Sequence, residues 1–215
     1  MNEAAGESLK NWVSEYDMAC APAYHFGLFG SIYFGAVVLG SLIFPPLADK
    51  IGRRPVAMLG MLLAGIAQTI LLFSSSLNFS YFLIFLMGLS MPMRVFVGFI
   101  YAMEFLPIKN TEMATGVTLG CDGLGIAIGA IWFMLISKDW RSFMAFATVL
   151  CYVGVLYTWC LMPESPKFLV SRGRYHHARK VITKMMRRNK GEFCFEDTEQ
   201  ELATQCLDGH YMCLW

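Results

Sequence analysis

The chain has 215 residues, of which 56% are hydrophobic and only 15% are charged, and its mean hydropathy is +0.50. This composition excludes an ordinary soluble domain and predicts an all-α integral membrane protein. The formal net charge of +1 gives no support to nucleic-acid binding, because the charges are segregated by loop and do not form one basic face.

Residues 1–24 are polar and carry four acidic side chains, and they lack the basic and apolar regions of a signal peptide. We therefore expect an extracellular or lumenal leader. Cys20 is the one cysteine that we place on that side of the membrane, so a disulfide there would need further sequence.

Five apolar segments follow, each long enough to cross about 30 Å of hydrocarbon as a helix. The predicted membrane helices form a bundle over residues 25–162 and cover residues 25–48, 55–73, 79–103, 113–136 and 142–161. Pro45 and Pro46 remove two amide donors, so they should bend or end the first helix.

A charged hairpin joins the first two apolar segments and consists of Asp49, Lys50, Gly52, Arg53 and Arg54, with one intervening isoleucine. Its three cations resist translocation, which predicts a cytoplasmic loop. Gly52 permits the turn, and Pro55 suits the first position of a helix.

The distribution of Lys and Arg fixes the predicted orientation. Loops assigned to the inside carry thirteen of these residues, and loops assigned to the outside carry three. This asymmetry predicts a multi-pass protein with its N-terminus outside and its C-terminus in the cytoplasm. We expect it in the plasma membrane.

Residues 163–215 form the expected cytoplasmic tail, which is basic from Lys167 to Lys190 and then acidic. Apolar residues in the basic part have partly helical spacing, typical of helices against the inner membrane surface; a solvated linker with short helices fits as well. The spacing of the possible zinc ligands matches no standard site, so we expect no metal and no cofactor; these residues are Cys194, Cys206, His210 and Cys213.

Two charges interrupt the apolar segments, Arg94 in the third and Asp122 in the fourth. Each lies nine residues from the cytoplasmic end of its helix, or roughly 13 Å at about 1.5 Å per residue. Consecutive antiparallel helices could therefore bring them together as a buried ion pair that fixes packing. The alternative is that they line a polar path for a solute.

Several motifs resemble elements of one family. Residues 47–55 (LADKIGRRP) resemble the loop after the second helix of the major facilitator superfamily, residues 101–107 (YAMEFLP) its element at the end of helix four, and residues 159–169 (WCLMPESPKFL) its element after helix six. Residues 14–20 (SEYDMAC) are similar to a segment of the organic cation and anion transporters. The resemblance implies that the five helices are helices two to six, an incomplete N-terminal bundle.

The resemblance also implies a cytoplasmic charge network of Asp49, Arg53, Glu104 and Glu164 that latches the outward-open state. Substrate would bind near the midplane, between two halves that rock alternately.

The predicted function is transport of small organic ions by a partial carrier. Its partners would be the lipid bilayer, the organic ion, and either a further copy or the second half. The alternatives are a sugar-type or synaptic-vesicle-type carrier, and a non-transporting membrane subunit. We expect no enzymatic activity, because the sequence has no recognisable set of nucleophile and base, no phosphate loop and no metal cluster.

Overall fold

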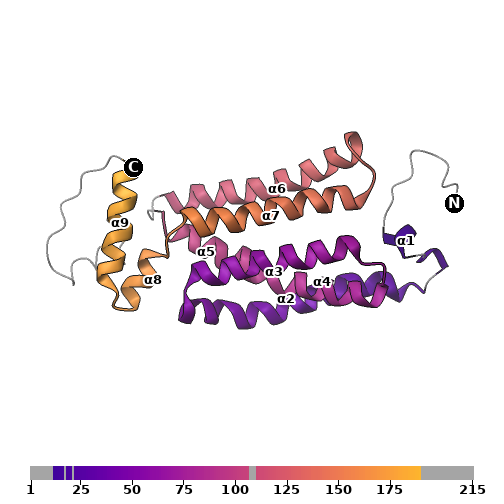
Figure 1. Cartoon of the computed structure of the whole chain (residues 1–215), viewed down its shortest axis with the longest axis horizontal. Helices are drawn as coiled ribbons and strands as arrows, with labels where there is room; N and C mark the ends of the chain where they lie inside the picture. The colour runs from indigo at the N-terminus through magenta and orange to yellow at the C-terminus, as the bar shows by residue number, and fades with distance from the viewer. Residues whose placement is uncertain (1–11, 17, 21, 107–109, 190–215) are drawn as a thin grey trace.

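The computed structural model describes residues 12–16, 18–20, 22–106 and 110–189 (Figure 1). Two short elements come first, α1 (Trp12–Glu15) and the 3-10 turn η1 (Met18–Cys20). The long helices are α2 (Tyr24–Ile51), α3 (Arg53–Phe73), α6 (Thr111–Leu135) and α7 (Trp140–Leu161), with one continuous span built from α4 (Leu77–Met91), η2 (Pro92–Val97) and α5 (Gly98–Met103). The last elements are α8 (Pro166–Ser171) and α9 (Tyr175–Asn189).

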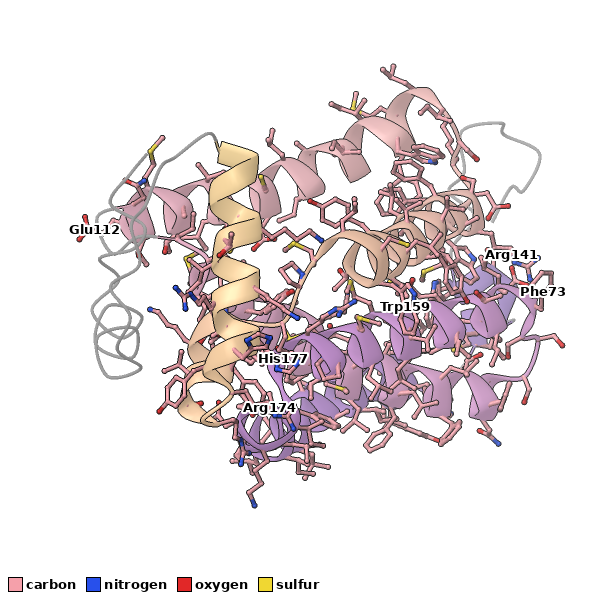
Figure 2. All side chains as sticks on the ribbon, turned by 60° about the vertical axis from the view of Figure 1, so that its left-hand side comes forward. Phe73, Glu112, Arg141, Trp159, Arg174 and His177 are labelled. Carbon is pink, nitrogen blue, oxygen red and sulfur yellow. The ribbon has the colours of Figure 1, made fainter. Side chains whose placement is uncertain are left out.

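In the described part of the chain, five helical segments are long and apolar enough to cross a membrane. They confirm the predicted all-α membrane architecture. Phe73 is the last residue of α3, and Arg141 lies in the first turn of α7. Figure 2 places both at the end of the bundle opposite to Glu112, Arg174 and His177. Successive spans therefore run in opposite directions, as the alternation of loops requires.

The first span is longer than the sequence analysis predicts, because α2 continues through Pro45 and Pro46 to Ile51. Missing amide donors are tolerated in membrane helices where neighbouring helices support the chain. Such support lies one turn earlier, where a Cβ on Gly40 would come 2.9 Å from the carbonyl oxygen of Leu89 and 3.1 Å from the ring of Pro92.

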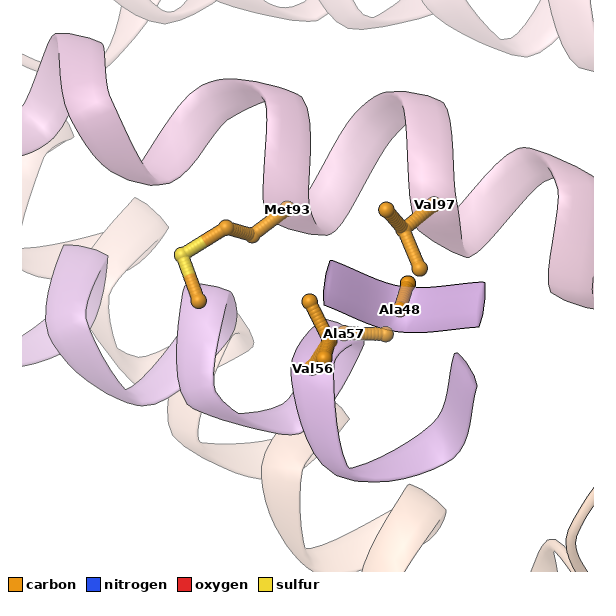
Figure 3. Packing of buried hydrophobic residues seen from close by; sticks show 5 residues of the cluster. All are labelled: Ala48, Val56, Ala57, Met93 and Val97. Atoms are coloured by element: carbon orange, nitrogen blue, oxygen red, sulfur yellow. The ribbon is translucent and has the colours of Figure 1, made fainter. Parts of the chain in front are cut away.

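The core lies between α2, α3 and the α4–η2–α5 span. Figure 3 shows a cluster of buried side chains from these segments, each at most 5% exposed; its members are Ala48, Val56, Ala57, Met93 and Val97. Small residues let the backbones approach closely, as expected where helices associate within lipid. At Gly88 a Cβ would overlap the carbonyl oxygen of Tyr33 and lie 2.9 Å from the Cβ of Ala36.

A second layer contains α6 and α7, and α7 packs against α3 (Figure 1). The thiol of Cys151 donates a hydrogen bond to the carbonyl oxygen of Met61 at 3.2 Å, and the hydroxyls of Thr69 and Tyr152 lie 3.0 Å apart. Helix α6 lies beside α7, where Trp132 Nε1 donates to Ser142 Oγ at 3.1 Å. The rest of α6 is largely exposed.

Candidate functional site

The turn between α2 and α3 is the first part of the site. Gly52 has φ of +123°, a conformation that side chains with a Cβ rarely adopt, and its amide donates to the carbonyl oxygen of Ala48 at 2.9 Å. A Cβ at this position would also lie 2.9 Å from Oε2 of Glu164. The turn therefore needs glycine for its backbone angle and for the approach of the Glu164 carboxylate.

Arg53 joins two carboxylates at this turn. Its guanidinium lies 3.1 Å from Oδ1 of Asp49, four residues earlier, and forms a second ion pair with Glu104 at the end of α5. The Asp49 side chain is 66% exposed, whereas the Glu104 side chain is 11% exposed. The buried partner therefore dominates, since ion pairs in full contact with water contribute little.

The side chain of Glu164 binds backbone amides of the hairpin. Its Oε1 accepts hydrogen bonds from the amides of Arg53 at 3.2 Å and Arg54 at 3.1 Å, the first amides of α3. These amides have no partner within the helix, and the helix dipole favours a negative charge beside them. Glu164 thus caps α3 from a position after α7, and we call Asp49, Arg53, Glu104 and Glu164 the hairpin network.

Further contacts fasten the same end of the bundle. Nη2 of Arg54 donates to the carbonyl oxygen of Trp159 at 2.7 Å, and the hydroxyl of Tyr101 donates to the carbonyl oxygen of Pro163. Nη2 of Arg172 donates to the carbonyl oxygens of Asp49 and Lys50 at 3.2 and 2.6 Å, so it satisfies the C-terminal end of α2.

Sequence reasoning missed Tyr101 and Arg172. Tyr101 lies inside the motif at residues 101–107, which was a usable signal. Arg172 is one of nine cations in the basic tail, and nothing in the sequence singles it out. Lys50 belongs to the predicted motif, but the structure leaves it exposed and gives only its carbonyl oxygen a role.

The structure does not bring Arg94 and Asp122 together. In the described part of the chain, neither residue takes part in the ion pairs that Arg53 and Arg141 form. Asp122 is exposed on α6, which packs beside α7 and not beside η2, so equal depth in the bilayer does not imply contact. Arg94 is half-buried in the π-helical η2, and its Nε is buried without a hydrogen-bond partner. The pairing stays a prediction from depth alone.

At the opposite end, a cavity of about 470 Å³ lies between the leader and the spans, lined mainly by apolar and aromatic atoms. Its walls include Trp12, Phe29, Tyr33, Met87 and Met144. Aromatic faces can hold an organic cation, and apolar walls can hold the hydrocarbon part of an organic ion. The four possible zinc ligands of the tail lie outside the described residues, so the expectation of no metal site stays a prediction.

Comparison with known proteins agrees with this geometry. A family model described as "Major Facilitator Superfamily" matches residues 16–195. The chain is 26% identical over 182 residues to solute carrier family 22 member 2 of Rattus norvegicus, covering 82% of this chain and 32% of the relative. It is 31% identical over 184 residues to solute carrier family 22 member 15 of Xenopus tropicalis, covering 83% and 33%.

A third relative is organic cation/carnitine transporter 2 of Rattus norvegicus, which is 30% identical over 191 residues, with 84% of this chain and 32% of the relative covered. The chain therefore spans about a third of the length of the curated relatives that it matches. Five apolar spans, the capped and ion-paired hairpin and the family match lead to one conclusion: the chain belongs to the major facilitator superfamily.

Proposed function

We propose that this chain supplies helices two to six of a carrier that moves small organic ions across the plasma membrane by alternating access. The observation that carries the proposal is the hairpin network, in which one loop binds the ends of α5 and α7 through Glu104 and Glu164. Contacts of this kind at one end of a bundle can hold that end closed and be released when the halves rock. The name of one relative, organic cation/carnitine transporter 2, supports organic ions as the solutes.

Uptake measurements test this function. Because rocking needs two complete halves and this chain supplies helices two to six, the chain should be expressed alone and together with the remaining parts of rat solute carrier family 22 member 2, its first helix and its second six-helix half. We expect the combined parts to accumulate a quaternary ammonium or an aryl carboxylate tracer above the level of this chain alone or of the added parts alone. Asp49→Asn should slow this uptake severalfold, because it removes one ion pair of the latch. The amount of protein at the cell surface should stay unchanged, because the lost pair is exposed and contributes little to folding.

Absence of uptake when all parts are correctly inserted would instead favour a non-transporting membrane subunit. Unchanged uptake by Asp49→Asn would remove the latch role and leave the transport proposal intact. These two failures are separable, because the first concerns the wild-type chain and the second only the variant.

We further propose that the hairpin network faces the cytoplasm and that the leader lies outside the cell. Cys20 is exposed in the structure, and Cys194 and Cys206 lie beyond the described residues in the tail. A membrane-impermeant maleimide should label Cys20 on intact cells, and Cys194 and Cys206 only after permeabilisation. Cys20→Ser gives the matched background. Labelling of the tail cysteines in sealed cells would reverse the orientation.

A further inference from the structure

Arg94 is a charge in the membrane interior whose neighbouring spans carry no carboxylate at its depth. Helices α2 and α3 pack against η2, and α7 packs against α3. Residues 18–48, 50–103 and 140–163 contain no Asp or Glu, so the interior of these spans holds the cation of Arg94 and no negative charge. Arg94 lies nine residues before the end of its span at Met103, or roughly 13 Å.

The backbone of Arg94 is fixed by the packing of α3. A Cβ on Gly60 would overlap the Cβ of Met93 and lie 2.9 Å from the amide nitrogen of Arg94, so the backbones of α3 and η2 touch at this point. The Met93 side chain is 5% exposed and packs against residues of α2 and α3 (Figure 3). The guanidinium of Arg94 therefore extends from a firmly held backbone, as a precise binding residue requires.

The Arg94 side chain lies at the edge of this core. Met93 before it is buried, whereas Val95 and Phe96 after it are exposed. Arg94 itself is half-buried, which leaves part of its side chain accessible, and its Nε is buried without a hydrogen-bond partner among the described residues. A cation at this depth is costly and typically marks the path of a solute or an ion. The π-helical form of η2 agrees with this role, because π turns occur frequently at functional sites.

We propose that Arg94 binds the anionic group of the carried solute, and that the solute is an organic anion such as an aryl carboxylate. This inference deepens the proposed function and rests on it. The planar guanidinium can hold a carboxylate through two parallel hydrogen bonds, which are strengthened by apolar surroundings. A cationic solute would instead meet a like charge with no carboxylate beside it, so Arg94 also selects against organic cations.

The test uses the full chain purified in an uncharged maltoside detergent and titrated with three probes that share an aryl group. They are 3-phenylpropanoate, its neutral amide 3-phenylpropanamide, and the cation phenethyltrimethylammonium. Binding to the folded chain is measured as a rise in the midpoint of thermal unfolding with probe concentration. We expect a saturable rise with the carboxylate and none with the amide or the ammonium.

Two substitutions of Arg94 define its role. Arg94→Gln should weaken carboxylate binding by about tenfold or more, because it removes hydrogen bonds from a charged donor. Arg94→Lys should retain part of the binding, since lysine keeps the charge but lacks the planar fork. Without probe, the Arg94→Gln chain should unfold at a midpoint no lower than that of the wild type. A lower midpoint, with carboxylate binding unchanged, would assign Arg94 to packing and overturn the proposal.

Lys180→Gln is the matched control, because it removes the same charge from the exposed surface of α9. It should bind the carboxylate as the wild type does, and weakening equal to that of Arg94→Gln would show diffuse attraction and overturn the site. Asp122→Asn should also leave binding unchanged. Binding that becomes about tenfold tighter in Asp122→Asn would show that Asp122 neutralises Arg94, and would overturn the assignment of Arg94 to the solute.

Uptake by the combined parts separates this inference from the proposed function. We expect the aryl carboxylate tracer to accumulate and the quaternary ammonium tracer to stay at background, with KM for the carboxylate raised about tenfold by Arg94→Gln. Accumulation of the ammonium alone would overturn the anion assignment and leave transport intact. If the purified chain binds the carboxylate but the combined parts accumulate neither tracer, the transport proposal fails and the site at Arg94 stands.

Discussion

Glu104→Gln is expected to lower the free energy of unfolding by about 3 kcal/mol. The substitution keeps the shape of the side chain but removes the negative charge that faces Arg53, and breaking a buried ion pair typically costs about 3–5 kcal/mol. The lower end applies because Arg53 retains Asp49 at 3.1 Å. Thermal or denaturant unfolding in detergent measures the effect, with the monodisperse fraction on size exclusion as a second readout.

Asp49→Asn is the matched control, since it removes the other partner of the same guanidinium. The Asp49 side chain is 66% exposed, and exposed ion pairs contribute about 0–1 kcal/mol. A loss for Asp49→Asn as large as that for Glu104→Gln would contradict the assignment of Glu104 as the dominant partner. In the double variant Arg53→Gln with Glu104→Gln, the loss should be smaller than the sum of the single losses, because no unpaired buried charge remains.

Gly88→Ala should separate α2 from α4 and destabilise the bundle by about 3 kcal/mol or leave the chain unassembled. The added methyl group would overlap the carbonyl oxygen of Tyr33, and a backbone atom cannot move aside as a side chain can. The measurement is the fraction of chain that remains monodisperse in detergent, together with its midpoint of thermal unfolding.

Gly98→Ala provides the comparison within the same span. An added Cβ at Gly98 would meet no atom within 4 Å, and alanine favours a helix by up to about 1 kcal/mol over glycine. Gly98→Ala should therefore be neutral or stabilising. If both variants behave alike, the close approach at Gly88 does not limit packing.

The membrane spans were predictable, because an apolar segment of about 20 residues with few or no charges is typical of a membrane-spanning helix. The end of α2 was not, because local propensity at Pro45 and Pro46 gave way to packing of Gly40 against Leu89 and Pro92. A proline in the sequence shows that a backbone N–H donor is missing. It does not show which neighbouring helices stabilise the chain at that position.

The candidate site was predictable only as a set of residues. The motifs indicated Arg53, Glu104 and Glu164 as members of the site. The partners of Glu164 are backbone amides, and because every residue except proline has one, the sequence does not indicate which amides Glu164 binds. The proposed contact of Arg94 with Asp122 used depth along the membrane normal, whereas contact also depends on which helices are neighbours. Nothing in the two apolar runs specifies that α6 lies beside α7.

The cap on α3 also has a consequence for biosynthesis. Glu164 lies 111 residues after Arg53, so the amides at the start of α3 must wait for their acceptor until the ribosome has passed four spans. At about 5–20 residues per second, that interval is roughly 5–20 s. During it, the start of α3 depends on water, lipid headgroups or the insertion machinery for hydrogen bonds. Closure of the hairpin network can therefore follow only after α7, the span that directly precedes Glu164, has been synthesised.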